Sequence, residues 1–346
     1  ETEIQLDYYY KINENTKLEA GYKSNIENDN SPVETYGGTS ESDAIAQTEL
    51  FNRFLYNQQV HALYATYSGK KDKFGYQLGL RGEYSAVETR SPGYNQKPSD
   101  VPPFKKDYLS LFPSVFLSYS LPGDNEFQLS YTRRISRPDG HEINPFVDLT
   151  DSTNISFGNP NLLPEFSNSF ELNYIKNWDK HVFSFSGYFR NTNDIVQRIS
   201  YLDGSVMKST FENISQSMST GTELVLKDEF FKILELTSTV NLYYYKLDGF
   251  KYLPEGATEY ITGKSNEDFS WNARMIASFR FPKSYSLQLT GNYNAKQIIA
   301  QGYQKANYSL DAGLRKQYKS LSFSVNARDI LDSRKRKSYT TGYGYT

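Results

Sequence analysis

The chain has 346 residues, a formal net charge of −2 and no cysteine. This charge gives no overall field that would attract nucleic acid, and the lack of thiols excludes disulfide scaffolds and cysteine metal sites. The mean hydropathy of −0.66 and the lack of any apolar run of about 18 residues exclude helical membrane spans. A membrane β-barrel passes this test, because only every second residue of its strands faces lipid.

Apolar and polar residues alternate with period 2 along most of the chain, which is typical of strands with two different faces. The alternation predicts fourteen strands, at residues 2–12, 17–26, 53–67, 74–90, 107–121, 126–136, 168–177, 181–201, 206–228, 233–247, 268–281, 285–299, 306–317 and 320–332. Most are longer than the 5–6 residues usual in globular sheets and reach the about 9–11 residues of a tilted membrane strand. Their length therefore favours a barrel in a bilayer over a soluble sandwich or propeller.

The two faces of these strands are chemically distinct. The row predicted to face lipid includes Trp271, Met275, Phe279, Leu287, Leu289, Leu310 and Phe323. The row predicted to face the lumen includes Arg274, Arg280, Gln288, Asn292 and Arg315. A slip of one residue would turn Arg274 toward lipid at a cost of about 2–4 kcal/mol, which fixes the register. The strand at 53–67 alternates poorly.

The connections alternate in length. Short connections are expected at 13–16, 69–73, 122–125, 178–180, 229–232, 282–284 and around Lys319, and long ones at 27–52, 91–106, 137–167, 248–267 and 300–305. The Asp203-Gly204 turn is the exception, a tight turn on the long-loop side. Because outer-membrane barrels have short periplasmic turns, both ends of the chain are expected on the outer side. Fourteen is then a lower bound, with at least one further strand beyond each end.

Several short motifs occur in a fixed order. They are YLSLFPS at 108–114, LSYTRRISRP at 129–138, NPF at 144–146, GNPNLLPE at 158–165, EN at 212–213 and GTEL at 221–224. Together they resemble the barrel of TonB-dependent outer-membrane receptors, in the outer membrane protein beta-barrel branch. The resemblance runs from about residue 57 to the end of the chain and is strongest at 108–226.

The resemblance implies an all-β, antiparallel, up-and-down barrel in the cell outer membrane, crossed many times by strands. Residues 1–346 would be the barrel portion, open or incomplete, and would supply about 14 strands of a barrel of about 22. The plug domain, the TonB box and the terminal strands would lie outside this portion. Implied partners are outer-membrane lipid, the plug of the same protein, TonB, and a surface substrate-binding lipoprotein as a further candidate. No nucleic acid and no cofactor are expected.

The implied function is TonB-dependent uptake of a scarce nutrient: a siderophore, haem, cobalamin, a peptide or a glycan. The principal alternative is a passive porin-type channel of about 14–16 strands. A barrel enzyme and a soluble all-β binding module are the other two alternatives. The segment upstream of residue 1 would separate a receptor from a porin, because a receptor carries a plug there. A Ser-His or Asp-His constellation at the lumen rim would indicate the enzyme, and folding without detergent would favour the soluble module.

The candidate substrate- or plug-facing residues are Arg133, Arg134, Arg137, Arg274, Arg280, Arg315, Tyr252 and Tyr260. Arginine binds carboxylates and anionic ligands through two parallel hydrogen bonds, and loop tyrosines stack on ligand rings. The simpler interpretation is a solvated lumen charge for each arginine and loop packing for each tyrosine. The segment 158–165 likewise either contacts substrate or ends a loop, because Pro160 and Pro164 fix the backbone.

No enzyme motif accompanies these residues. The three histidines, His61, His141 and His181, are far apart and form no His-Glu-x-x-His pattern. His141 is a candidate ligand of haem iron or a plain loop residue. The sequence contains no Gly-x-Ser-x-Gly elbow, and no catalytic or metal site is predicted.

Overall fold

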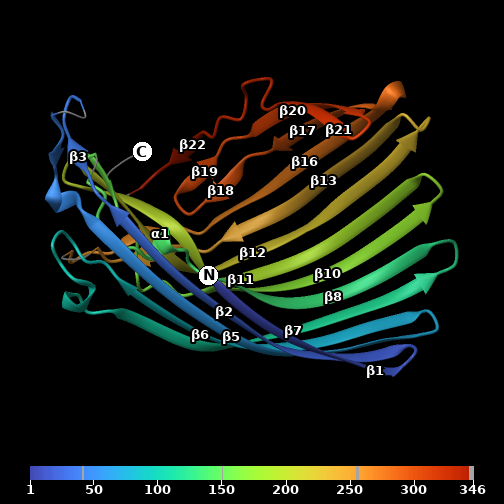
Figure 1. The fold of residues 1–346 in the computed structure, drawn as a ribbon, viewed down its shortest axis with the longest axis horizontal. Coiled ribbons are helices and arrows are strands. Elements are labelled where there is room, and N and C mark those ends of the chain that lie inside the picture. Colours follow the sequence, from blue (N-terminus) through green and yellow to red (C-terminus); the bar gives the residue numbers. More distant parts are fainter. Residues whose placement is uncertain (41–42, 150, 255–256, 343–346) are drawn as a thin grey trace.

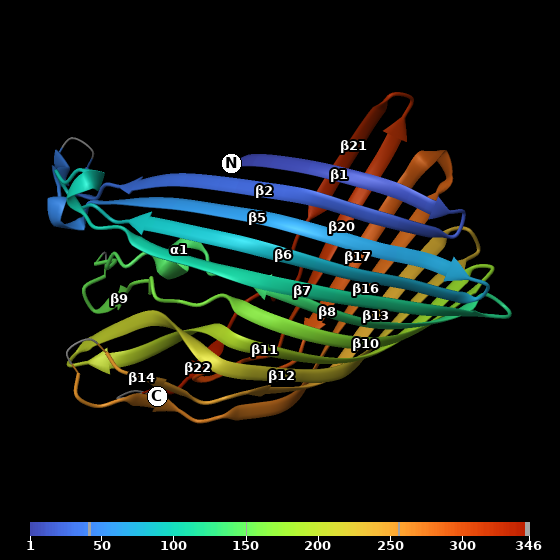
Figure 2. The same cartoon turned by 90° about the horizontal axis from the view of Figure 1, so that it is seen from below.

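A computed structural model describes residues 1–40, 43–149, 151–254 and 257–342. Fourteen long strands form one curved sheet (Figures 1 and 2). They are β1 (Thr2–Asn13), β2 (Thr16–Val33), β5 (Asn52–Lys71), β6 (Phe74–Arg90), β7 (Phe104–Leu121), β8 (Asn125–Ser136), β10 (Glu165–Trp178), β11 (His181–Asp203), β12 (Val206–Phe230), β13 (Leu234–Leu247), β16 (Asn266–Phe281), β17 (Tyr285–Asn294), β20 (Asn307–Tyr318) and β21 (Leu321–Ala327). In the part of the chain that the structure describes, no helix is long and apolar enough to cross a membrane.

Shorter elements lie at the loop end of the sheet. They are β3 (Tyr36–Gly37), β4 (Ile45–Ala46), α1 (Gly140–Ile143), β9 (Asn154–Ser156), β14 (Phe250–Tyr252), β15 (Ile261–Gly263), β18 (Gln297–Ile299), β19 (Gly302–Gln304) and β22 (Ser338–Thr340). Single 3-10 turns occur at Thr48–Leu50, Pro98–Asp100 and Pro282–Ser284. The β3–β4 pair, the β14–β15 hairpin and the β18–β19–β22 group are small sheets of their own.

Each long strand pairs antiparallel with the long strand that follows it in the chain. This confirms the predicted up-and-down arrangement. The exception is β9, three residues that run parallel to β12. Among the described residues no pairing joins β1 to β21, so the sheet curls without closing here. β1 starts opposite Ile26 of β2 and runs to the first short turn, whereas β21 pairs with residues 312–318 of β20, next to the last short turn (Figure 2).

All fourteen predicted strands are present, with three notable differences in length. β2 continues to Val33 rather than ending at 26, so the first part of the expected connection at 27–52 is strand. β17 ends at Asn294 rather than 299, because residues 297–304 fold back as the β18–β19 hairpin. β21 ends at Ala327 rather than 332. Asp329 and Asp332 there have φ of 49° and 48°, in the left-handed region that breaks a strand. Gly204, with φ of 62°, makes the tight turn between the long β11 and β12 possible.

The predicted faces are confirmed. Asn241 and Asn272, which pair directly across β13 and β16, line an internal cavity. Trp271, beside Asn272 in the chain, therefore points to the opposite, convex side. Leu63 and Leu109 are 69% and 74% exposed on that outer row, as expected of side chains that face lipid.

The poor alternation of β5 has a physical cause. Its inner row carries Phe54, Tyr56 and Ala62, which are all buried. Phe54 and Tyr56 pack under a loop that crosses the concave side, together with Ile143 and Leu162. Near the loop end the apolar residues Phe54 and Tyr56 therefore lie on the inner row, toward that loop, whereas the outer row carries Arg53 and Asn57, which reverses the alternation of a membrane strand.

Candidate functional site

The loop from 137 to 164 lies across the concave side at the loop end of the sheet (Figure 2). α1 begins there with Asp139, whose carboxylate accepts hydrogen bonds from the N–H groups of His141 and Glu142, the usual cap of a helix start. Ile143 belongs to a buried cluster with Phe54 of β5, and Phe211 of β12 packs against it. The loop therefore connects two distant parts of the inner wall.

The segment 158–165 is held by backbone-directed hydrogen bonds. The N–H of Gly158 donates to the Asn144 carbonyl at 2.8 Å and that of Asn159 to the Glu142 carbonyl at 2.7 Å. The Asn159 amide donates to Glu212 Oε1 at 3.0 Å, and Asn213 bonds both backbone groups of Leu163. The motifs at 144–146, 158–165 and 212–213 thus bind one another, which supports the structural interpretation of this segment.

Arg137 anchors the beginning of the same loop. Its Nη2 lies 2.6 Å from Glu83 Oε2 and 2.9 Å from Ser85 Oγ, and its Nε donates to the Tyr108 hydroxyl at 3.1 Å. Glu83 is only 6% exposed and also accepts from Arg81 at 2.6 Å. A buried carboxylate needs such partners. Arg137 is therefore committed to the inner wall formed by β6 and β7.

A second apolar cluster joins the tall β11–β12 hairpin to the small loop sheets. Its buried members are Ile195, Ile199, Tyr201, Ile214, Leu247, Phe250, Ile261, Ile298 and Ala300. Gln301 adds a two-way link, because its Oε1 accepts from the Ser200 N–H at 2.7 Å and its Nε2 donates to the Ser200 carbonyl at 2.9 Å. We call the loop end of the sheet, with its two buried apolar clusters, the mouth. The mouth is thus a packed structure with its own buried core.

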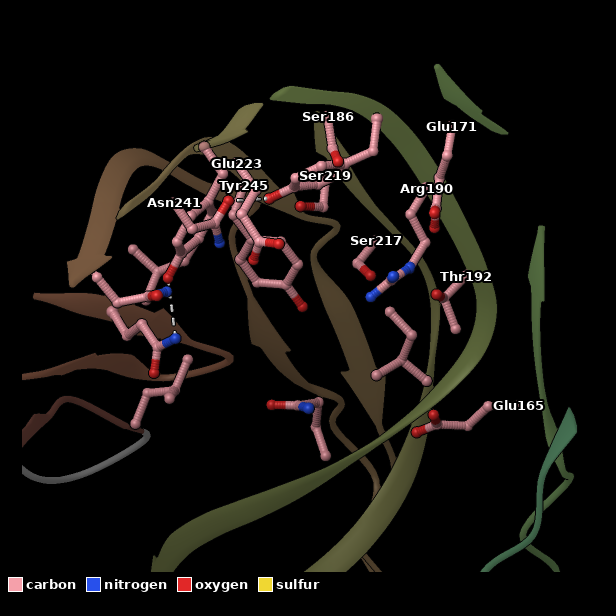
Figure 3. A pocket seen from close by; sticks show the side chains of 18 residues that line it. Glu165, Glu171, Ser186, Arg190, Thr192, Ser217, Ser219, Glu223, Asn241 and Tyr245 are labelled. Carbon is pink, nitrogen blue, oxygen red and sulfur yellow. Dashed lines mark hydrogen bonds between the residues drawn. The ribbon is translucent and has the colours of Figure 1, made fainter. Parts of the chain in front are cut away.

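A polar cavity of about 690 Å³ lies on the inner wall beneath this cluster (Figure 3). Strands β10 to β13, β16 and β18 supply its lining. Three carboxylates, Glu165, Glu171 and Glu223, face it with a single cation, Arg190. Volumes of about 300–1,000 Å³ are typical of sites for small ligands, so this cavity is a candidate ligand site on the concave side.

Two tyrosines of the cavity wall are fixed by amide side chains. The Tyr188 hydroxyl donates to Asn241 Oδ1 at 3.0 Å. The Gln297 amide donates to the Tyr243 hydroxyl at 2.9 Å. Their rings are therefore positioned before any ligand arrives, and each has a polar tip and an apolar face.

The arginines predicted to face substrate or plug are dispersed. Arg134 lies exposed on the inner row of β8. Arg274 pairs with Thr239 and Asn292 on the inner wall. Arg280 forms an ion pair with Glu235 at 2.7 Å near the short turns, and Arg315 Nε donates to Ser322 Oγ at 2.9 Å.

Three further predicted residues have different surroundings. Arg133 is on the outward row of β8, with its guanidinium 5.0 Å from the Phe166 ring, so its placement on the substrate-facing side was wrong. Period 2 puts it opposite to Arg134. Tyr252 packs against the second apolar cluster, 5.7 Å from the Tyr201 ring. Tyr260 is 60% exposed and touches neither cluster among the described residues.

Of the cavity residues, Glu171, Arg190 and Glu223 were not among the predicted site residues, whereas Glu165 ends the segment 158–165, for which a substrate contact was one of the two interpretations. The period-2 alternation predicts that Glu171, Arg190 and Glu223 face inward. Which of them lie next to one another depends on the register across several strands. The histidines do not converge: His61 contacts Tyr22 on the outward face, and His181 lies 2.7 Å from Asp228 near a short turn. Within 1–40, 43–149, 151–254 and 257–342, no group of three acidic, histidine or cysteine side chains could hold a metal ion.

Known proteins support the barrel interpretation of this architecture. Similar solved structures are the copper transporter OprC, with a TM-score of 0.64 and 12% identity, and the ferric-catecholate import receptor Fiu from E. coli K12, with 0.60 and 11%. A third is the ferric yersiniabactin uptake receptor FyuA from Yersinia pestis, with 0.57 and 11%. Each match covers 95% of this chain but only 50%, 50% and 49% of the respective structure, so this chain spans about half their length.

At such low identity these structures inform on the fold alone. No curated protein sequence matches the chain. The sequence does match the outer membrane protein beta-barrel family, over residues 1–346. The chain belongs to this outer membrane protein beta-barrel family, and its strands cross the outer membrane.

Proposed function

We propose that this chain is the barrel portion of a TonB-dependent receptor that takes up a scarce nutrient across the outer membrane. The observation that carries this proposal is the packed mouth above a polar cavity on the inner wall. A passive channel needs only an open lumen. Here two buried clusters and several side-chain to backbone bonds build a structured entrance, which is what selective capture of a ligand requires.

The fold of copper, ferric-catecholate and ferric-yersiniabactin importers supports uptake rather than catalysis. In this proposal a plug domain fills the concave side, TonB contacts the protein from the periplasm, and the proton gradient of the inner membrane supplies the energy. Arg134, Arg274 and Arg315 face the lumen and would contact the plug or the substrate. A surface lipoprotein that hands over substrate is a further candidate partner. The nutrient would be a siderophore, haem, cobalamin, a peptide or a glycan.

The decisive experiment uses the full-length protein in two settings. In a planar bilayer we expect no steady conductance, because the plug closes the lumen. In cells we expect nutrient-limited growth to require the protein, and uptake to collapse when a protonophore discharges the inner-membrane gradient. Steady single-size conductance together with uptake that survives the protonophore would instead establish a passive porin-type channel.

A further inference from the structure

The inner wall carries a continuous line of directly paired hydrogen-bonding side chains. Six of them are carboxamides: Gln128, Asn173, Asn241, Asn272, Asn294 and Asn307. Ser118 precedes Gln128 in the line, and Ser186 and Glu223 connect Asn173 to Asn241. Each residue is the cross-strand partner of the next, from β7 to β20. We call these nine residues the amide track.

The amide track crosses the wall from one end to the other. Ser118 lies three residues before the end of β7 at a short turn, whereas Asn307 is the first residue of β20, at the loop end. Neighbouring strands are about 4.8 Å apart, so eight steps span about 38 Å. Barrel strands tilt by about 35–45° from the barrel axis. A line perpendicular to them therefore changes its height along that axis at each strand.

Open space follows most of this line. Ser118, Gln128 and Asn173 line one cavity of about 520 Å³. Ser186, Glu223, Asn241 and Asn272 line the cavity of about 690 Å³ under the mouth, where Figure 3 shows the first three. The track therefore leads from the candidate site toward the periplasmic end of the wall.

The chemistry of the track is uncharged except at Glu223. A carboxamide both donates and accepts hydrogen bonds, and so does a hydroxyl group. The Asn294 amide, for example, donates to Asn307 Oδ1 at 3.1 Å. Tyr188 and Tyr243 both pair with Gly221, which lies two residues before Glu223 on the same face of β12, so their rings lie beside the track. Planar amides next to tyrosine rings match a ligand with many hydroxyl groups and apolar C–H faces.

The charge balance of the cavity separates this ligand from an anionic one. Glu165, Glu171 and Glu223 face a single Arg190 there, and recognition of an anion requires cations or aligned N–H donors. We propose that the amide track binds and guides a neutral oligosaccharide from the mouth into the lumen. This inference rests on the proposed uptake function and names the substrate class for the same site.

The test is binding of defined probes to the full-length protein in detergent. Neutral hexasaccharides of glucose, xylose and mannose would be titrated by calorimetry, beside a ferric tris-catecholate as the anionic probe. At least one hexasaccharide should bind, and the ferric complex should not. Asn241→Leu combined with Asn272→Leu should weaken that binding by about tenfold or more, because two neutral hydrogen-bonding groups are lost. The matched control, Thr237→Val with Ser278→Ala, changes inner-row residues of the same two strands away from the track and should leave binding unchanged.

Three results would overturn the inference. They are binding of the ferric complex but of no hexasaccharide, equal loss of affinity in the control pair, and unchanged affinity in the asparagine pair. If the asparagine pair leaves sugar affinity unchanged but lowers the thermal stability of the plug, the track contacts the plug and not a sugar. None of these touches the uptake function, which fails separately if nutrient uptake persists when the proton gradient is discharged.

Discussion

The membrane half and the mouth of this sheet are built on different principles. In the membrane half the convex row is apolar and exposed, as with Leu109 at 74% and Met275 at 52%, and the concave row is polar. In the mouth, Ile199 and Ile214 are 0% and 1% exposed, and loops far apart in sequence share one buried cluster. The first region depends on lipid to cover its apolar face, whereas the second makes its own core, as a soluble domain does.

This difference determines how each region responds to change. In the membrane half the cost of a substitution depends on the face on which it lies, because the lipid side tolerates apolar side chains and the lumen side tolerates polar ones. In the mouth the cost depends on specific partners, because packing and buried polar bonds are local and exacting. In the membrane half, substitutions at two neighbouring residues of one strand should therefore differ greatly in their cost to stability. In the mouth, the cost should differ between residues that have different contacts.

The largest effect is expected from an arginine on the convex face. Met275→Arg places a charge toward lipid, between Trp271 and Phe279 of the same outer row, and should cost about 2–4 kcal/mol of folding stability. Ile276→Arg, one residue further, points to the lumen and should cost much less. Urea-induced unfolding of both variants in lipid vesicles, followed by gel-shift, measures the difference. Equal costs for the two variants would mean that the register is wrong.

The next effect concerns the anchor of the mouth loop. Arg137→Met removes the partner that lies 2.6 Å from the buried Glu83 and leaves that carboxylate with Arg81. The expected loss is about 2 kcal/mol, from a buried charge that loses part of its compensation. Thermal unfolding, and protease cleavage within 138–164, should both reveal it.

Arg336→Met is the matched control for this change. Arg336 is exposed in the loop between β21 and β22, and its loss should leave melting and cleavage unchanged. If both variants behave alike, the mouth loop is not held by Arg137.

A smaller effect is expected where backbones come close. A Cβ on Gly158 would lie 2.6 Å from the carbonyl oxygens of Glu142 and Asn144, so Gly158→Ala must displace the loop, at roughly 1–2 kcal/mol. Gly187→Ala adds the same methyl in β11, where nothing lies within 4 Å, and should be neutral. A neutral Gly158→Ala in thermal unfolding would contradict the close contact between the two loop segments.

The same division explains what the sequence could predict. All fourteen strands and the faces of β16, β17 and β20 followed from period 2, because a bilayer enforces alternation on every strand. The strand at 53–67 was recognisable but poorly patterned, since Phe54 and Tyr56 serve the mouth core and not the membrane. The predicted role of Arg137 concerned ligand or plug contact. Its partners Glu83 and Ser85 lie 52–54 residues earlier, and no local pattern records such a contact.

The amide track shows an intermediate case. That Asn241 and Asn272 face inward follows from parity alone. That they pair directly, and continue through Asn294 to Asn307, depends on how far each strand slides past the next. Turn lengths set this slide, and a change of one residue in one turn would break the line. The sequence therefore contained the members of the track but not their alignment.

The smallest expected effect is a dependence on pH in the loop after β21. The Asp329 carboxylate accepts hydrogen bonds from the N–H groups of Ser333 and Arg334, at 3.0 Å each. These bonds favour the charged form and hold the pKa of Asp329 below its ordinary value. A group with a lowered pKa stabilises the folded loop above the ordinary carboxyl pKa of about 3.9, and loses this contribution as the pH falls through the lowered value.

Hydrogen exchange of the full-length protein measures this effect directly. Protection of the Ser333 and Arg334 amides, corrected for intrinsic exchange, should be constant from pH 7 down to the ordinary carboxyl range and fall only below it. Asp329→Asn should show weakened protection already at neutral pH, because the charge-assisted bonds are gone. Asp332→Asn is the control, since the Asp332 side chain is 84% exposed and contacts Lys335. Protection that declines well above the ordinary carboxyl pKa would show that another group organises this loop. In that case contacts with residues distant in sequence would stabilise this loop, as they do in the packed mouth, and the local hydrogen bonds of Asp329 would not.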